Sequence, residues 1–404
     1  MLVEPLPPAY KPSSREEVDA VLARARRGER LSFDDAVVLL KAKDLAPIGL
    51  AADEIRRKKH GDKVYFRNDL NLNHTNVCAA DCGFCAFKRK GTEVDAYTFD
   101  RDQVREKARA ARLSGIDEFH VVGGLHPDLG PEYFEDIFRI MKEEHPRAYI
   151  QGLTGVEIDF ICKKFKIDPE PLLVRLKAAG LDSLPGGGAE VFHPAARKRM
   201  MATKITAERF LGIHEAAHRI GMPTNVSILF GHVETPEEIA DHLMKCRDMQ
   251  DKTGGFHAFV NLAYNADNNE LQHRYGLKGP TGTQILKQVA VSRLVLDNFP
   301  HIKIPWVTTG KQVAQISLAF GADDIGGSAF EERILEAAGG KTWAMTSFSV
   351  TQQVGVPSVV QKANRTVHIV QTSNLENLIR DGGYEPVRAA GCYEPIVLYP
   401  EEPQ

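Results

Sequence analysis

Residues 66–87 read FRNDLNLNHTNVCAADCGFCAF, a strand-like run that leads directly into a loop with three cysteines. Apolar and polar residues alternate before Asn76, which predicts a β-strand. Cys78, Cys82 and Cys85 follow with the spacing Cys-x3-Cys-x2-Cys. Such residues directly after a strand predict a functional site at the carboxyl end of a sheet.

The rest of the chain alternates short apolar runs with amphipathic stretches, which is typical of repeated strand–helix units. The predicted strands are 66–76, 118–124, 148–154, 181–186, 224–231 and 256–263. Right-handed crossovers would form a barrel or a doubly wound sheet. Barrel closure is favoured because the cysteine loop and the segments 123–127, 186–190 and 231–234 all follow strands and would ring one mouth. The predicted fold class is α/β, a partial (βα)6 barrel similar to a TIM barrel.

Three parts are predicted along the chain. Residues 1–62 form a helical prefix, in which Ser32 is placed as an N-cap before Asp34 and Asp35. Residues 63–300 form the barrel. Residues 301–404 add one more strand, further helices and a C-terminal extension that packs on the barrel. A single catalytic domain with additions is the simplest interpretation.

Composition limits the classes of function. The chain has 404 residues and a formal net charge of −3, so it offers no global field for binding nucleic acid or an anionic membrane. The opening MLVEPLPPAYKPSSREEVD contains acids and prolines, which argues against a signal peptide, and no apolar run is long enough to cross a bilayer. Six cysteines are too sparse for a disulfide scaffold. The pattern favours metal ligation in a reducing cytoplasm.

The clustered cysteines match the ligand type of an iron–sulfur cluster in which three irons are held and the fourth stays open. Three alternatives are weaker. Structural zinc needs four ligands, and His74 is the only close candidate for the fourth. A ferredoxin normally provides four cysteines for each cluster. Simple buried thiols are scattered along a chain, as are Cys162, Cys246 and Cys392.

The cysteine spacing, with an aromatic residue before the last cysteine, resembles the signature of the radical S-adenosylmethionine (SAM) superfamily. From about Glu29 to Gly340, the blocks LNHTNVCAADCGFCAFKR, HVVGGLHPDL, LPGGGAEVF, ILFGHVET, DKTGGFHAF, VSRLVLDN and FGADDIGG resemble its menaquinone-pathway branch, most closely the aminodeoxyfutalosine synthases. Dehypoxanthine futalosine cyclases and the enzymes that make a deazaflavin chromophore share most of these blocks. Residues 152–158 (GLTGVEI) are more similar to the synthases, although Gly155 replaces their alanine.

This resemblance implies a radical SAM barrel with a [4Fe–4S] cluster on Cys78, Cys82 and Cys85, whose open iron binds SAM. It implies a transferase that adds the 5′-deoxyadenosyl radical to 3-[(1-carboxyvinyl)oxy]benzoate, with rearrangement and decarboxylation to 6-amino-6-deoxyfutalosine. An external low-potential electron donor is then required. The cyclase-type alternative would release free 5′-deoxyadenosine. A non-catalytic iron–sulfur or zinc protein remains an alternative of a different class.

The resemblance also implies a set of cofactor contacts. Phe84 resembles an adenine-contacting element, and Gly123 and Gly124 resemble the strand edge that meets the methionyl amine. Glu190 would accept hydrogen bonds from the ribose hydroxyls. Each has a structural alternative: Phe84 as a core residue, the glycines as a site of close packing, and Glu190 as an exposed loop acid.

Acid–base and substrate contacts are predicted at the same mouth. His126, His232 and Glu234 are candidate acids, bases or polar anchors, and structural hydrogen bonds are the alternative for the histidines. The two carboxylates of the implied substrate need fixed cations. Candidates for this role are Arg89, Arg197, Lys204 and Arg293, with solvated surface positions as the alternative.

Overall fold

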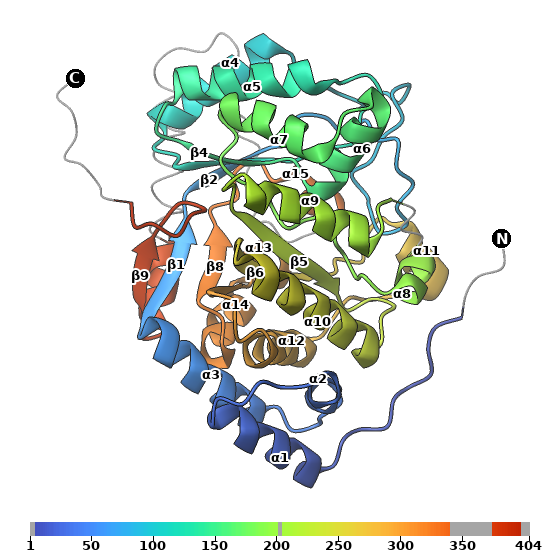
Figure 1. The fold of residues 1–404 in the computed structure, drawn as a ribbon, viewed down its shortest axis with the longest axis vertical. Helices are drawn as coiled ribbons and strands as arrows, with labels where there is room; N and C mark the ends of the chain where they lie inside the picture. Colours follow the sequence, from blue (N-terminus) through green and yellow to red (C-terminus); the bar gives the residue numbers. More distant parts are fainter. Residues whose placement is uncertain (1–4, 201–203, 340–373, 397–404) are drawn as a thin grey trace.

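The N-terminal part of the chain is helical. The computed structural model describes residues 5–200, 204–339 and 374–396. It begins with α1 (Arg15–Arg26), α2 (Phe33–Leu40) and α3 (Ala46–His60), which lie together at one end of the molecule in Figure 1. Ser32 accepts a hydrogen bond of 3.2 Å from the Asp35 backbone N–H, and the Asp35 carboxylate accepts one of 2.9 Å from the Ser32 N–H. The predicted N-cap at Ser32 is confirmed.

The strands form two parallel sheets that together line the barrel. One sheet has the order β5-β6-β7-β8-β1-β9 and the other the order β2-β3-β4. Isolated bridges at Gln151–Ser183 and Leu184–Thr224 connect the edge of β4 to β5. The strand bounds are β1 (Lys63–Arg67), β2 (Asp69–Leu72), β3 (Glu118–Val121), β4 (Tyr149–Gly152), β5 (Thr224–Phe230), β6 (Phe256–Ala263), β7 (His301–Lys303), β8 (Asp324–Gly327) and β9 (Glu385–Arg388).

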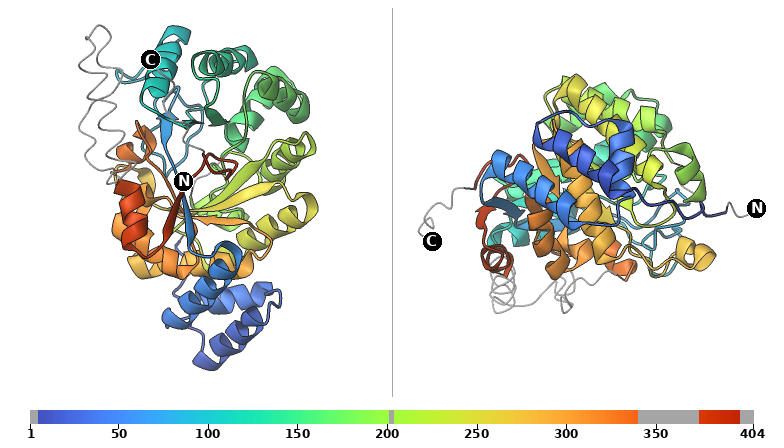
Figure 2. Two further views of the ribbon diagram at one scale, coloured as in Figure 1. Left: turned by 90° about the vertical axis from the view of Figure 1, so that its left-hand side faces the viewer. Right: turned by 90° about the horizontal axis from the view of Figure 1, so that it is seen from below.

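Helices cover the outside of this ring, as Figures 1 and 2 show. Their apolar faces bury residues such as Phe138 and Leu176 against the sheets, which supplies most of the driving force for folding. The longer helices are α4 (Arg101–Leu113), α5 (Pro131–Glu144), α6 (Gly155–Phe165), α7 (Pro169–Ala178), α9 (Ala207–Arg219), α10 (Pro236–Thr253) and α12 (Gly282–Val295). Shorter helices are α8 (Pro194–Arg199), α11 (Glu270–Tyr275), α13 (Trp306–Thr309), α14 (Lys311–Ser317), η1 (Leu318–Phe320) and α15 (Arg333–Ala337).

The α/β barrel class predicted from the sequence is confirmed. Predicted strands at 118–124, 148–154, 224–231 and 256–263 correspond to β3, β4, β5 and β6. The predicted strand 66–76 differs, because its first residues end β1 and a break at Asn68 separates them from β2. The predicted strand at 181–186 is reduced to bridges at Ser183 and Leu184. Parallel pairing and buried apolar runs are strong signals, whereas such a break leaves little trace in a sequence.

The sheet continues beyond residue 300, where the C-terminal extension was predicted to start. That position lies between β6 and β7, which pair in parallel, and β8 connects β7 to β1. β9 then extends the same sheet beside β1. Most of the tail after Gly340 lies outside the described residues.

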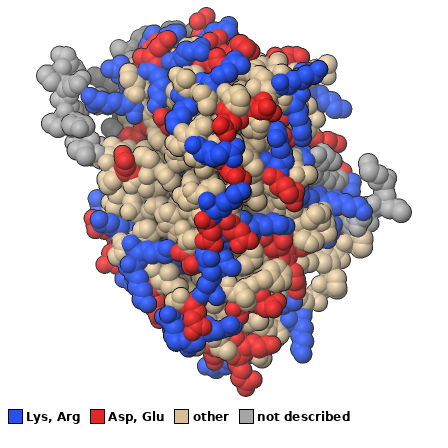
Figure 3. Space-filling view, viewed as in Figure 1, with Lys and Arg blue, Asp and Glu red and all other residues tan. Residues whose placement is uncertain are grey.

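Charged side chains of both signs are interspersed over the face shown in Figure 3. This distribution agrees with the small net charge. Within the described ranges, none of the helices has the length and apolar character needed to span a bilayer.

Candidate active site

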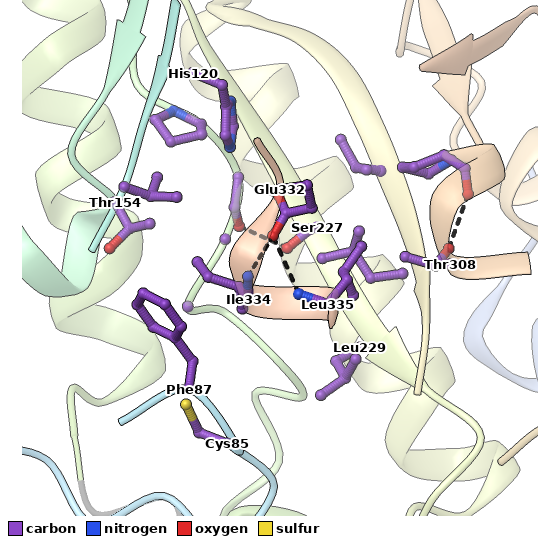
Figure 4. Close-up of a pocket in the computed structure, with 18 of the residues that line it drawn as sticks. Cys85, Phe87, His120, Thr154, Ser227, Leu229, Thr308, Glu332, Ile334 and Leu335 are labelled. Atoms are coloured by element: carbon purple, nitrogen blue, oxygen red, sulfur yellow. Dashed lines mark hydrogen bonds between the residues drawn. The ribbon is translucent and has the colours of Figure 1, made fainter. Parts of the chain in front are cut away.

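A cavity of about 380 Å³ lies within the barrel and at the carboxyl ends of its strands. Figure 4 shows Cys85 and Phe87 on one side of this cavity and Ser227 and Leu229 of β5 on another. The predicted site residues that line it are Cys78, Cys82, Phe84, Cys85, Gly123, Gly124, Glu190 and Lys204. The structure therefore brings together residues from four separate loops.

The cysteine loop is attached to the loop after β3. The Ala79 N–H donates to the Leu125 carbonyl at 2.9 Å, and the Leu125 N–H points at the Cys78 sulfur at 3.3 Å. A backbone N–H near a sulfur stabilises a thiolate ligand, because it donates to the negative charge. The loop thus presents its sulfur atoms to the cavity on a fixed backbone.

The three cysteines of one short loop fit the donor set of an iron–sulfur cluster, which is held by thiolates. Structural zinc takes four ligands, and this loop offers three sulfur atoms to the cavity. Elsewhere among the described residues, His60, His301 and Asp323 bring ligand atoms within 4.8 Å of one another, but these residues do not line the cavity.

His74, the candidate fourth zinc ligand, does not line the cavity. Its side chain is fully buried, and neither ring nitrogen has a hydrogen-bond partner among the described residues. The ring packs edge-on against Phe134, with 5.3 Å between the ring centres. Burial lowers the pKa of His74 to about 3, so the imidazole is neutral. We therefore assign His74 to the core that supports the cysteine loop.

Gly123 and Gly124 are required by close packing against this loop. A Cβ on Gly123 would lie 2.6 Å from the His74 ring, and one on Gly124 would lie 2.2 Å from the Val77 carbonyl oxygen. Both glycines also line the cavity, so the packing and ligand interpretations are compatible. The Gly123 N–H donates at 3.1 Å to Glu157, a residue that the sequence interpretation missed.

Glu157 is a buried acid on the wall of the cavity. Its carboxylate also accepts the Thr154 N–H at 2.7 Å, as the third residue of a capping box at the start of α6. Burial raises the pKa of Glu157 to about 7, although these backbone hydrogen bonds oppose the rise. The motif Thr-x-x-Glu predicts the capping box, but only the barrel turns this side of the helix toward the site.

Glu190 and Lys204 form an ion pair in the cavity wall. The Lys204 ammonium donates to Glu190 at 2.9 Å, and the Glu190 backbone has a φ of 49°, in the left-handed region. Burial by itself would lower the pKa of Lys204. The nearby Glu190 and Cys82 have a larger opposite effect and hold this pKa above its usual value. Burial raises the pKa of the Cys82 thiol, and Lys204 opposes that rise. A cation beside the thiols favours their ligand form.

Arg197 supports this loop and does not line the cavity. Its guanidinium donates to the carbonyls of Ala189 and Val191, on either side of Glu190, at 3.1 and 3.4 Å. A third hydrogen bond goes to the Ile205 carbonyl at 2.5 Å. We interpret Arg197 as the residue that fixes the unusual backbone of Glu190.

The other two predicted arginines also lie outside the cavity. Arg89 donates to Asp95 at 2.8 Å and to the Ala86 carbonyl at 2.9 Å, and it borders a separate hollow behind the cysteine loop. Arg293 is fully buried near the amino ends of the strands, where it pairs with Asp323. Spacing along the chain does not reveal which face of the barrel an arginine reaches.

The predicted acid–base residues are not among those that line the cavity. His232 and Glu234 pair at 2.9 Å, and Glu234 also accepts the His232 N–H at 3.0 Å. Burial alone would lower the pKa of His232, but Glu234 reverses this and raises it. His232 holds the pKa of Glu234 at about 2 against the effect of burial. His126 accepts the Asp128 N–H at 3.0 Å in a turn. The three residues thus make these hydrogen bonds within their own loops.

Several polar residues of the cavity were missed by the sequence interpretation. They occupy inward-facing strand positions or the chain after β8, and the main ones are Asn71, His120, Gln151, Ser227, Lys303 and Glu332. Alternation along a strand predicts that such residues share a face. It does not tell whether that face is the inside or the outside of a barrel.

Comparisons with known proteins agree with this geometry. The family model of the radical SAM superfamily matches residues 72–246, and that of the CofH/MqnC C-terminal region matches residues 253–363. The chain is 41% identical to aminodeoxyfutalosine synthase of Thermus thermophilus, over 80% of this chain and 87% of that protein. It is 34% identical to cyclic dehypoxanthine futalosine synthase of Streptomyces coelicolor, over 96% and 91% of the two chains.

Packing gives a reason for glycine at position 155. A Cβ on Gly155 would lie 3.0 Å from the Phe210 ring.

Solved structures share the fold. The hydrogenase maturase HydG from Carboxydothermus hydrogenoformans superposes with a TM-score of 0.68 at 16% identity, over 94% of this chain and 81% of the maturase. On the family matches and the relatives together, the chain belongs to the radical SAM superfamily, in the group that carries the CofH/MqnC C-terminal region.

Proposed function

We propose that the chain is an aminodeoxyfutalosine synthase. It would join the 5′-deoxyadenosyl group of SAM to 3-[(1-carboxyvinyl)oxy]benzoate and form 6-amino-6-deoxyfutalosine, with loss of carbon dioxide and methionine. The observation that carries this proposal is the 41% identity to the Thermus synthase, against 34% to the cyclic dehypoxanthine futalosine synthase. The substrate follows from the resemblance of the sequence blocks to the synthases.

Cys78, Cys82 and Cys85 are the proposed cluster ligands. Thiolates are the usual ligands of iron–sulfur clusters, and all three cysteines line the cavity. When bound, the cluster supplies the electron that cleaves SAM and SAM supplies the adenosyl group. The N–H of Leu125 stabilises one ligand sulfur, and Lys204 places a positive charge near another. An external electron donor completes the system.

The same wall offers contacts for SAM. We propose that Glu190, oriented by Lys204 and by the backbone contacts of Arg197, accepts hydrogen bonds from the ribose hydroxyls. Gly123 and Gly124 leave their strand edge open to the methionyl amine, and Glu157 adds an acid beside that edge. Phe84, which lies 5.1 Å from the Lys204 nitrogen, offers an apolar surface for the adenine.

Apolar side chains surround the space between these contacts and the barrel interior. Figure 4 shows Phe87, Leu229, Ile334 and Leu335 around the cavity. They exclude water from reactive species, which is the main task of the protein in radical chemistry. Glu332 holds the start of α15 at this place, because it accepts the N–H groups of Ile334 at 2.7 Å and Leu335 at 3.1 Å.

Product analysis tests the proposal. The chain would be reconstituted with iron and sulfide under anoxic conditions and incubated with SAM, dithionite and the proposed substrate. An adenosylated product without free 5′-deoxyadenosine supports the synthase. Free 5′-deoxyadenosine and a cyclised product from dehypoxanthine futalosine would identify the cyclase. Absence of SAM cleavage by a protein that holds its cluster would point to a non-catalytic carrier.

A further inference from the structure

Lys303 is a partly buried lysine that faces the cavity and has no partner among the described residues. It is the last residue of β7 and lines the barrel interior. The other two lysines in the described wall of the cavity are paired, Lys88 with Asp81 and Lys204 with Glu190. Neither a hydrogen bond nor an ion pair joins the Lys303 ammonium to any described residue. A cation that faces an enclosed cavity in this way is a suitable partner for an anion from outside the chain.

The acids nearest in the barrel are already engaged. Asp324 accepts a hydrogen bond of 2.9 Å from Arg67, and Glu118 lies 3.7 Å from the same guanidinium. Asp69 accepts a backbone N–H from the chain after β8 at 2.6 Å. Burial lowers the pKa of Lys303, and Arg67 adds to this, while the three acids oppose it from a distance. These acids reduce the energetic cost of the charge on Lys303, but among the described residues none of them accepts a hydrogen bond from its ammonium group.

Neutral polar side chains share the cavity wall with this lysine. His120 contributes no second cation, because burial, with help from Lys303 and Arg67, lowers its pKa to about 3. Strand register aligns two rows of residues that all line the cavity. The rows are Ser227, Val260 and Lys303 in one sheet and Asn71, His120 and Gln151 in the other.

We propose that Lys303, assisted by the neutral polar side chains of these rows, binds the ring carboxylate of an aryl carboxylate substrate. This subsite rests on the proposed function, whose substrate carries one carboxylate on its ring and one on its enol ether. The vinyl carbon has to face the adenosyl group at the cysteine wall. Asn71 lies within β2, whereas Cys78 lies in the loop beyond that strand, so the rows lie deeper in the barrel. The far end of the substrate, its ring carboxylate, reaches them.

This assignment also names the protein cation that would bind the ring carboxylate of the substrate. The sequence suggested Arg89, Arg197 and Arg293, and the structure uses all three in contacts outside the cavity. Lys204 is in the cavity but is paired with Glu190. Among the cationic side chains described in the cavity wall, Lys303 is the one whose donors remain available to a ligand.

Equilibrium binding to the reconstituted holoenzyme tests the subsite without turnover. Two probes, the full substrate and 2-phenoxyacrylate, which lacks the ring carboxylate, would be titrated by calorimetry with SAM present and no reductant. Lys303→Met should weaken binding of the full substrate by roughly 10- to 100-fold, the loss expected for one charge-assisted hydrogen bond. Binding of 2-phenoxyacrylate should change less than about threefold. Lys59→Met, at an exposed lysine outside the cavity, should change neither.

Equal weakening of both probes, or none, in Lys303→Met would overturn the subsite. If this variant does not fold, Lys303→Gln and the preference of the wild type for the full substrate over 2-phenoxyacrylate decide the question, and no preference overturns it. The proposed function fails separately. If the full substrate does not bind but 3-hydroxybenzoate binds in a Lys303-dependent manner, the subsite stands and the synthase assignment is wrong. If neither ligand binds, both are overturned.

Discussion

The Lys204 ammonium donates a hydrogen bond of 2.9 Å to Glu190 and lies 5.1 Å from the centre of the Phe84 ring. One side chain thus connects the loop that presents Glu190 with the loop that carries the cysteines. Its charge also opposes the raised pKa of Cys82. This relationship couples the proposed ribose contact to the proposed cluster.

Replacing Lys204 therefore affects SAM binding. Lys204→Met leaves Glu190 as a buried acid without its cation, so we expect the affinity for SAM to fall by roughly tenfold and iron to be lost faster in air. Calorimetric titration of SAM into the unreduced holoenzyme measures the first effect. Lys163→Met, at an exposed lysine of α6, is the control and should behave as wild type. Unaltered SAM affinity in Lys204→Met would refute the coupling.

Loss of one clustered cysteine should abolish the cluster. In Cys82→Ala we expect iron and sulfide content after reconstitution to fall to background, because two cysteines do not hold a cubane. Chemical iron analysis and the visible absorption of the cluster give the readout. Cys162→Ala, at a buried cysteine of α6 that does not line the cavity, should keep its iron. A Cys82→Ala protein with a full cluster contradicts the ligand assignment.

Gly124→Ala should disrupt the cysteine loop by steric contact. A Cβ there meets the Val77 carbonyl oxygen at 2.2 Å, and backbone atoms cannot move aside without shifting Cys78. We expect the midpoint of thermal unfolding and the iron content to fall together. Gly212→Ala is the matched control, since a Cβ at this position in α9 would meet no atom of the described part of the chain within 4 Å. Gly212→Ala should be more stable than the wild type by about 0.5–1 kcal/mol. Equal unfolding midpoints and iron contents in the two variants would contradict the close contact between Gly124 and Val77.

The His232–Glu234 pair should make stability depend on pH. The pKa of Glu234 is lowered from its ordinary value of 4.5 to about 2. Glu234 therefore stabilises the fold fully at pH values above about 4.5 and loses this effect as the pH falls toward 2. The pKa of His232 is raised, so its contribution is complete below about 6.5 and is lost as the pH rises through the folded value. Their joint contribution is therefore largest between these limits.

Glu234→Gln tests this dependence. It should lower the free energy of unfolding by about 1.5–3 kcal/mol near pH 6, because charge-assisted hydrogen bonds are lost. The difference from wild type should shrink as the pH falls below 4.5. Denaturant unfolding across the pH range gives the curves. Asp19→Asn, at an exposed ion pair of α1, should cost less than about 1 kcal/mol at every pH. A difference that stays constant with pH would contradict the pairing.

Sequence reasoning succeeded where a signal is local. The cysteine spacing and the β5 and β6 runs are contiguous in the chain, so residue pattern alone predicts them. The cap at Ser32 is another example, because its hydrogen bonds lie within one turn of helix. The order of blocks also indicated the superfamily, as the family matches confirm.

The cationic side chains show why the rest could not be predicted. Arg197, Arg293 and Lys303 are all buried or partly buried and all lie near strand ends or helices of the barrel. Only Lys303 points into the cavity, because the register of β7 with β6 sets its direction. Arg197 instead meets the carbonyls of Ala189 and Val191, and no pattern in the sequence predicts that contact.

The sequence by itself determined the parallel barrel, the cysteine loop at one strand end and the class of chemistry. These depend on periodicity and short spacings, which hold whatever the neighbouring strands do. The tertiary structure alone decided which cations line the cavity, that His232 and Glu234 pair with each other outside it, and that Gly123 and Gly124 pack against the cysteine loop. Such contacts join residues distant in the chain, and their geometry is set by strand register and barrel closure.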